Sequence, residues 1–268
     1  MASSECNDNL LVQLNQSHGI SRILLNDTTR KNALSKCMLK KLINVLDTIA
    51  TDPKQKVVVM RGAGGVFCSG ADLQWMKDGL HQSEEENKAD AGLFYELFTK
   101  LNSFPKPLIM WVEKYAMGGA LGLLACADYV IAEKDVQLAF SEVKLGLVPA
   151  TIAPFVIQKI GHSQARALML SAEVFTAKKA KRIGLIHEVA HSKEIQTRVD
   201  KLCQQFKNNS AQAMESTKQL ISQLSKNLDS HEQETLCINK IAEARNSEEG
   251  QEGVTAFFEK RQPKWYIK

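Results

Sequence analysis

The pattern of apolar and polar residues near the start of the chain predicts two short strands and a helix. Residues 10–14 and 20–25 carry the apolar and β-branched runs of strands, and residues 17–19 supply a turn between them. We therefore expect an opening β-hairpin. After it, Ser35 stands as an N-cap before apolar residues spaced three and four apart, which predicts an amphipathic helix ending near Pro53.

Three continuous apolar runs follow, at residues 57–60, 108–112 and 129–132. They lack the alternation of a half-exposed strand, which indicates strands buried on both faces, as in a parallel sheet. Because glycine-rich turns and helical patterns separate these runs, strand and helix alternate along the chain. This order predicts an α/β fold in which right-handed crossovers join parallel strands.

The other segments of the chain predict a charged surface segment and helices. Residues 80–91 are charged and poor in apolar side chains, so we expect a mobile surface segment there, followed by a helix over residues 93–101. From about Phe155 the pattern is helical to the end, without an internal repeat. We therefore expect a helical C-terminal region.

Composition and charge exclude several classes of protein. The chain has 268 residues, of which 44% are hydrophobic and 24% charged, as in an ordinary globular protein and not a disordered one. Its net charge of +4 is spread along the chain without an aromatic and basic module, which argues against nucleic-acid binding. The sequence shows no secretory signal and no membrane-spanning apolar run, so we expect a cytoplasmic location and no membrane partner. The six cysteines form no C-x-x-C pair, and we expect no metal site.

Two glycine-bearing segments are candidates for backbone hydrogen-bond donors. A dinucleotide-binding fingerprint over the first segment would need glycine where Phe67 stands, and no Walker A motif is present. Gly70 can adopt a conformation that leaves the Ala71 N–H pointing into a cavity. Gly118 and Gly119 open a small-residue helix, whose first N–H groups are unpaired. Together the two segments would form an oxyanion hole, while a plain glycine turn and close helix packing are the alternatives.

Glu142 is the candidate acid or base. Apolar residues flank it, and partial burial would raise its pKa toward the neutral range, where a carboxyl group can transfer protons. The alternative is a structural ion pair, for example with Lys144. The usual nucleophiles have little support, because no G-x-S-x-G motif is present and both Cys68 and Cys126 lie in apolar runs.

Five segments, taken in order, resemble the enoyl-CoA hydratase/isomerase (crotonase) family. They are similar to its N-A-L-S segment, its F-C-A/S-G-A-D-L loop, its A-x-G-G turn, its glutamate-bearing segment and its E-G-x-x-A-F-x-E-K-R tail. In this chain the corresponding residues are 30–35, 67–73, 116–119, 141–146 and 252–261. The resemblance therefore covers almost the whole chain.

The resemblance implies a spiral core of ββα repeats, placed at residues 1–200, and a helical trimerisation region at residues 201–268. It also implies an acyl-CoA substrate, no separate cofactor, and a homotrimer or homohexamer. The N–H groups of Ala71 and Gly119 would bind the thioester oxygen, and Glu142 would transfer protons. Other residues would contact the substrate, with the last two covering its nucleotide from the same or a neighbouring subunit: Lys31, Ala33, Gly70, Asp72, Leu73, Gly118, Gly122, Phe257 and Lys260.

One position departs from the family's pattern. Hydratases that this chain resembles hold a water between two glutamates, and the first of these positions is Gly122 here. The run over residues 141–156 is similar to the bacterial branch that acts on branched, carboxylated acyl-CoAs, with methylglutaconyl-CoA hydratase as the nearest member. We therefore expect hydration of a branched, 3-methylglutaconyl-like enoyl-CoA with Glu142 as acid and base. A one-base enoyl-CoA isomerase and a non-catalytic acyl-CoA-binding subunit are the alternatives.

Overall fold

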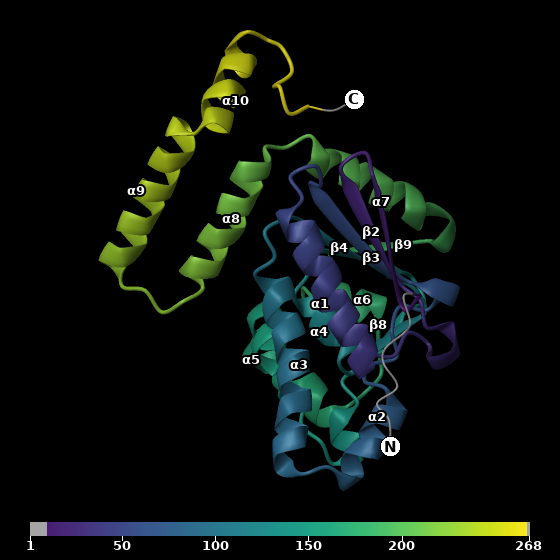
Figure 1. The fold of residues 1–268 in the computed structure, drawn as a ribbon. Coiled ribbons are helices and arrows are strands. Elements are labelled where there is room, and N and C mark those ends of the chain that lie inside the picture. Colours follow the sequence, from purple (N-terminus) through teal and green to yellow (C-terminus); the bar gives the residue numbers. More distant parts are fainter. Residues whose placement is uncertain (1–9, 267–268) are drawn as a thin grey trace.

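The computed structural model describes residues 10–266 and has the expected α/β architecture (Figure 1). A six-stranded sheet has the order β1-β2-β3-β4-β6-β9, and a smaller sheet has the order β5-β7-β8. In the large sheet β1 and β2 form the predicted antiparallel hairpin, and every other neighbouring pair is parallel. The strands are β1 (Val12–Ser17), β2 (Ile20–Leu25), β3 (Val57–Gly62), β4 (Leu108–Val112), β5 (Tyr115–Met117), β6 (Tyr129–Glu133), β7 (Gln137–Ala139), β8 (Phe175–Thr176) and β9 (Glu188–Ala190).

Helices pack on both faces of the large sheet. On one face, alternate strand residues such as Val58 and Met60 join a core with α1, α3 and α4, while Val57 and Val59 face α7 on the other side. This two-sided burial explains why the strand sequences are continuously apolar. The helices are α1 (Lys36–Thr51), α2 (Leu73–Asp78), α3 (Glu84–Asn102), α4 (Ala120–Ala125), α5 (Ala153–Ser171), α6 (Ala177–Arg182), α7 (Ser192–Lys207), α8 (Ala211–Leu224), α9 (Ser230–Asn246) and α10 (Glu248–Phe258), with short 3-10 helices η1 (Thr28–Arg30), η2 (Ala63–Gly65), η3 (Gly79–His81) and η4 (Glu142–Leu145).

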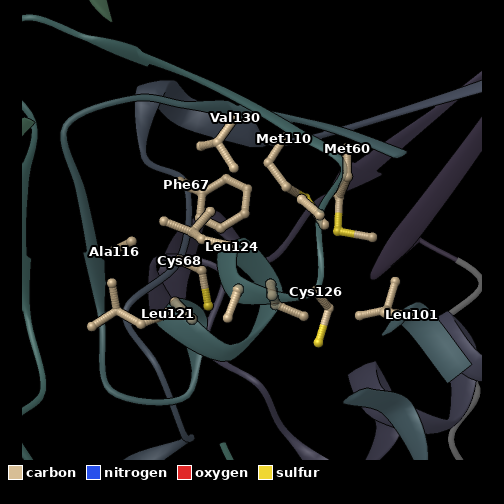
Figure 2. Close-up of a cluster of buried hydrophobic side chains, with 14 of the residues drawn as sticks. Met60, Phe67, Cys68, Leu101, Met110, Ala116, Leu121, Leu124, Cys126 and Val130 are labelled. Carbon is tan, nitrogen blue, oxygen red and sulfur yellow. The ribbon is translucent and has the colours of Figure 1, made fainter. Parts of the chain in front are cut away.

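The core reaches directly under the loop that follows β3. Phe67 and Cys68 of this loop are fully buried, and Figure 2 shows them among core side chains that include Leu121 and Leu124 of α4. Burial of a large aromatic side chain stabilises a fold by a few kcal/mol, so Phe67 anchors the loop firmly to the helix and strands beneath it. The chain just after Cys68 is therefore held in a fixed position.

Two expectations from the sequence were wrong. Residues 84–91, expected to be a mobile surface segment, belong to α3. The helix starts there because Ser83 and Glu86 form a capping box, in which each side chain accepts a hydrogen bond from the other residue's backbone N–H. The region after residue 155 is also not wholly helical, because β8 pairs with β7 and β9 pairs with β6. These pairings join segments distant in sequence, and local patterns do not report them.

The last three helices extend away from the sheet (Figure 1). They carry large apolar side chains that are exposed to solvent in the single chain: Ile221, Leu224, Ile238, Ile241, Val254, Phe257 and Phe258. An apolar surface of this kind is typical of a region that another protein surface covers. Within residues 10–266, no helix combines the length and the apolar character that crossing a membrane requires.

Candidate active site

The loop after β3 and the turn after β5 meet at Gly70. Its backbone has a φ of +93°, and a Cβ atom at this position would lie 2.6 Å from the carbonyl oxygen of Met117 and 3.7 Å from Cα of Gly118. The Met117 N–H also donates a hydrogen bond to the Cys68 carbonyl oxygen at 3.3 Å. Only glycine combines this φ with this close approach, so Gly70 allows the two segments to touch.

Ala71 and Gly119 lie on the two sides of this contact. The residues around Ala71 are hydrogen-bonded, because the Leu34 N–H donates to the Gly70 carbonyl at 2.7 Å and the Asp72 N–H donates to the Leu34 carbonyl at 3.3 Å. The N–H groups of Ala71 and Gly119 themselves donate to no acceptor in the part of the chain that the structure describes. Two unpaired backbone donors at one junction are the components of an oxyanion hole.

Glu142 brings a carboxylate to the same junction. It begins η4, and a Cβ atom on Gly118 would lie 3.3 Å from its Oε1 atom. Its Oε2 atom is buried and has no hydrogen-bond partner among the described residues. Burial raises the pKa of Glu142, and a hydrogen bond from its own backbone offsets part of this rise. Among residues 10–266 Glu142 forms no ion pair, and Lys144 is exposed, so the ion-pair alternative is not what the structure shows.

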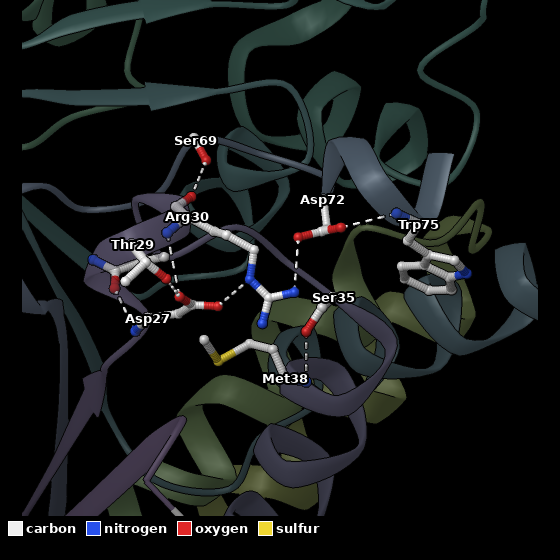
Figure 3. Close-up of polar contacts among 9 residues, drawn as sticks. Asp27, Thr29, Arg30, Ser35, Met38, Ser69, Asp72 and Trp75 are labelled. Carbon is white, nitrogen blue, oxygen red and sulfur yellow. Dashed lines mark hydrogen bonds and ion pairs between the residues drawn. The ribbon is translucent and has the colours of Figure 1, made fainter. Parts of the chain in front are cut away.

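Arg30 ties the Ala71 loop to the segment before α1 through two buried carboxylates (Figure 3). Its Nε atom donates to Asp27 Oδ2 at 2.7 Å, and its Nη1 atom donates to Asp72 Oδ2 at 3.3 Å. The other carboxylate oxygen of Asp72 accepts from the Trp75 N–H at 2.8 Å and caps α2. The Ser69 hydroxyl donates to the Arg30 carbonyl at 3.1 Å. This network fixes the residues on both sides of Ala71.

A cavity of about 590 Å³ opens beside Ala71. Apolar side chains from α2, α3 and η4 form most of its wall, which suits an acyl group. The aromatic rings of Trp75 and Phe94 stack there, with centroids 5.2 Å apart. The lining residues are Ala71, Leu73, Trp75, Met76, Lys77, Gly79, Leu80, Gln82, Asn87, Asp90, Ala91, Phe94, Leu145, Leu147 and Thr151.

The position of the missing second glutamate is closed by core packing. Gly122 lies inside α4, and a Cβ atom there would lie 2.5 Å from Cγ2 of Ile152 and 2.7 Å from Cε1 of Phe98. Both neighbours are buried. The space beside Gly122 is therefore filled by apolar side chains, and Gly122 does not line the cavity beside Ala71.

Three of the remaining residues expected to bind substrate lie near the site, and two lie far from it. Lys31, with a left-handed φ of +56°, and buried Ala33 lie in the segment before α1, next to the Arg30 network. Leu73 lines the cavity. Phe257 and Lys260 lie on and just after α10, at the opposite end of the molecule from α2 (Figure 1). Within one chain they are therefore not brought to the site, and their role in covering the nucleotide stays a prediction about a neighbouring subunit.

The cysteines of this region are core residues. Burial raises the pKa of Cys68 to about 12 and also raises that of Cys126, so both thiols stay protonated at neutral pH and are poor nucleophiles. A sulfur nucleophile is not part of this site.

The sequence analysis missed the residues of α3 that line the cavity, including Asp90 and Phe94. Two signals were available. The Ser83 and Glu86 spacing is that of a capping box, and Phe94, Leu97 and Leu101 continue an apolar helical face. The side-chain role of Asp27 was also missed, although a local signal was available: Asp27 caps η1 and accepts hydrogen bonds from Thr29 and Arg30, two and three residues further on.

Comparison with known proteins agrees with this geometry. A family model described as enoyl-CoA hydratase/isomerase matches residues 15–268. The chain belongs to the enoyl-CoA hydratase/isomerase family. The 2,3-dehydroadipyl-CoA hydratase of Escherichia coli is 30% identical over 250 residues, which are 90% of this chain and 92% of that protein.

Solved structures of the family superimpose closely on this enzyme. An enoyl-CoA hydratase from Shewanella pealeana is 35% identical with a TM-score of 0.93, covering 97% of this chain and 98% of that one. AtuE from Pseudomonas aeruginosa is 32% identical with a TM-score of 0.92, covering 96% and 100%. The predicted crotonase fold and the assignment to an enzyme of this hydratase/isomerase family are confirmed. The finer assignment to the methylglutaconyl-CoA hydratase branch stays a prediction.

Proposed function

We propose that this enzyme catalyses the reversible hydration of a branched enoyl-CoA, with Glu142 as its single acid and base. The observation that carries the proposal is the position of the Glu142 carboxylate, which lies against Gly118 with one buried oxygen that has no partner in the described chain. A buried carboxyl group with a raised pKa, next to unpaired backbone donors, is suited to proton transfer on a polarised carbonyl compound.

The proposed reaction uses the backbone donors and the carboxylate in turn. The thioester oxygen accepts hydrogen bonds from the N–H groups of Ala71 and Gly119. The Glu142 carboxylate removes a proton from water as the water oxygen bonds to the β-carbon, and the electrons of the double bond move into the thioester to give an enolate. Glu142 then returns that proton to the α-carbon, so one water has been added. Losing one such backbone donor typically raises the barrier by about 2.7–4 kcal/mol.

The branch at the β-carbon comes from the sequence resemblance. A 3-methylglutaconyl-like acyl group has a tertiary carbon where water adds, and the mainly apolar cavity beside Ala71 has room for such a group. We include 3-methylglutaconyl-CoA as the first substrate to test.

A one-base isomerase is the second candidate, and the packing around Gly122 favours it. Ile152 and Phe98 fill the space where a second carboxylate would stand. Moving a double bond from the 3 to the 2 position needs only one base, which takes a proton from the α-carbon and returns it to the γ-carbon. Glu142 could do this alone.

One experiment separates these functions and the non-catalytic alternative. The protein is incubated in ¹⁸O-labelled water with 2-enoyl-CoAs, including 3-methylglutaconyl-CoA, and with 3-enoyl-CoAs. Hydration lowers the absorbance of the conjugated thioester and places ¹⁸O on the product. Isomerisation of 3-enoyl-CoA raises that absorbance without ¹⁸O. Absence of turnover on every substrate contradicts both enzymatic proposals and supports a binding subunit.

Two variants test the assignment to Glu142. Glu142→Gln should abolish most of the turnover. Glu113→Gln is the matched control, because Glu113 is also a half-buried carboxyl group whose pKa is raised by burial and by Glu133. Equal losses in the two variants would contradict a specific role for Glu142.

We also propose that the enzyme is cytoplasmic and assembles as a homotrimer or homohexamer through α8, α9 and α10. The exposed apolar side chains of these helices support the assembly. Light scattering coupled to gel filtration measures the mass directly, and a monomer at working concentrations would contradict this part of the proposal.

A further inference from the structure

The acyl cavity contains a polar group that the proposed reaction does not use. Asp90 of α3 is 9% exposed and accepts hydrogen bonds from Trp75 Nε1 at 2.6 Å, from Lys36 Nζ at 2.8 Å and from Gln82 Nε2 at 3.3 Å. Burial opposes the charged form of Asp90, but these donors outweigh it and lower the pKa of the carboxyl group. The Asp90 carboxylate is therefore ionised and paired with Lys36, and the protein itself supplies its hydrogen-bond donors.

This polar group is separated from the oxyanion hole by two aromatic rings. A Cβ atom on Gly119 would lie 3.8 Å from Cε1 of Phe94, the Phe94 ring stacks on Trp75, and the Trp75 indole N–H reaches Asp90. An acyl chain that starts at the Ala71 and Gly119 amides thus passes the apolar rings before it meets polar side chains. The polar group faces the distal part of the substrate.

One buried amide oxygen at this place lacks a donor. The Gln82 Nε2 atom donates to Asp90, and flipping the amide would set its oxygen against the carboxylate, so the orientation of the amide is fixed. Its Oε1 atom is then left buried and without a donor in the described chain. Asn87 is exposed, and its Nδ2 atom donates to the Ser83 carbonyl at 3.1 Å.

The Gln82 oxygen lies beside Gly79 in the wall of the cavity. A Cβ atom on Gly79 would lie 3.5 Å from Gln82 Oε1 and 3.5 Å from Asn87 Oδ1, and all three residues line the cavity. A buried acceptor without a donor costs about 1–3 kcal/mol, so a ligand that supplies a donor gains this energy and one that presents another acceptor does not. A terminal methyl group leaves the Gln82 oxygen unsatisfied.

We propose that, among acyl-CoA substrates without a terminal charge, this cavity selects those that carry a hydroxyl group, a neutral hydrogen-bond donor, on the distal part of the acyl chain, and that Gln82 is the residue that selects it. The proposal rests on the proposed function of the site.

The test compares substrates that differ only in their terminal group. Unsaturated CoA thioesters of six, eight and ten carbons are prepared with a terminal methyl or hydroxymethyl group, and kcat/KM is measured for each. At the length that fits best we expect the hydroxyl substrate to exceed the methyl substrate about tenfold, which corresponds to about 1.4 kcal/mol.

Gln82→Met keeps the length of the side chain and removes the acceptor. In this variant the hydroxyl-to-methyl ratio of kcat/KM should fall to about 1. Gln74→Met is the matched control, because Gln74 is an exposed residue of α2 whose amide bonds Asp78 and which does not line the cavity. Its ratio should equal that of the wild type. A wild-type ratio of 1 or below, or a preference that persists in Gln82→Met, overturns the proposal.

Calorimetry makes failure of this inference distinguishable from failure of the proposed function. Saturated acyl-CoAs with terminal hydroxymethyl or methyl groups are titrated into the wild-type protein, which needs no turnover. Tighter binding of the hydroxyl compound supports the selection even where no enoyl-CoA is converted. Equal binding, together with normal turnover, overturns the selection and leaves the proposed chemistry standing.

Discussion

Gly122 packs so closely that one added methyl group should destabilise the fold. The added Cβ would lie 2.5 Å from Ile152 and 2.7 Å from Phe98, both of which are buried side chains that must move. Forcing a methyl group into a full core typically costs about 1–3 kcal/mol. Part of this cost is offset, because alanine has a higher helix propensity than glycine, by up to about 1 kcal/mol. We therefore expect Gly122→Ala to lower the free energy of unfolding by about 1–2 kcal/mol.

The assay is a double-mutant cycle followed by urea unfolding. Ile152→Ala alone should cost about 2–5 kcal/mol, because it leaves a cavity. It also removes the atom that the new methyl group meets, so Gly122→Ala with Ile152→Ala should lose at least about 1 kcal/mol less than the sum of the single losses. The matched control is Gly92→Ala in α3, where a Cβ meets nothing within 4 Å and stability should rise by about 0.5–1 kcal/mol.

Additive losses in the cycle would refute the packing argument. So would a stabilised Gly122→Ala protein, because a methyl group would then fit without displacing its neighbours. The outcome matters for the chemistry, since a glutamate at this position needs the same space. If the packing argument holds, Gly122→Glu should destabilise the protein and should not improve hydration.

Further predictions concern charged groups. Glu142→Gln should lower turnover about 10²–10⁴-fold. The same variant should raise the free energy of unfolding at neutral pH. The pKa of Glu142 is higher in the folded protein than its ordinary value of 4.5, so wild-type stability falls as the pH rises above 4.5 and the carboxyl group ionises. A Glu142→Gln protein that is no more stable than wild type at pH 7 contradicts this. The acid limb of wild-type kcat/KM should lie above pH 4.5, since the base form is required. The pKa of His187 is lowered to about 4, mainly by burial, so the urea midpoint should fall as the pH drops from 6.5 to 4, and less so in His187→Gln. Arg30→Leu leaves Asp27 and Asp72 without their cation and should cost about 1–3 kcal/mol and reduce kcat more than Arg30→Lys does; equal kcat in both variants would show that the charge at this position does not contribute to turnover.

Local sequence patterns predicted the elements that local forces determine. The buried runs at β3, β4 and β6 became parallel strands, and the Ser35 cap and its apolar face became α1, because burial and capping act within a few residues. The short strands β8 and β9 were not predictable in this way, since each exists only through a partner distant in the sequence.

For the candidate site, too, local patterns predicted some residues and did not predict their long-range contacts. Glycines beside apolar runs marked Gly70 and Gly119, and a lone carboxylate among apolar residues marked Glu142. The ties that hold these groups were hidden, because Arg30 reaches Asp72 across 42 positions of the chain. The filling of the space beside Gly122 by Ile152 could be seen only once helices were packed together.

The contact at Gly70 also separates reactivity from selectivity in this molecule. Because the two amide donors are brought together by backbone touching backbone, their spacing does not depend on the rotamer of any side chain. The cavity wall is built by different segments, chiefly α2 and α3, whose residues can be exchanged without disturbing that spacing. Engineering a new substrate range should therefore begin in the wall of the cavity and leave the glycine junction untouched.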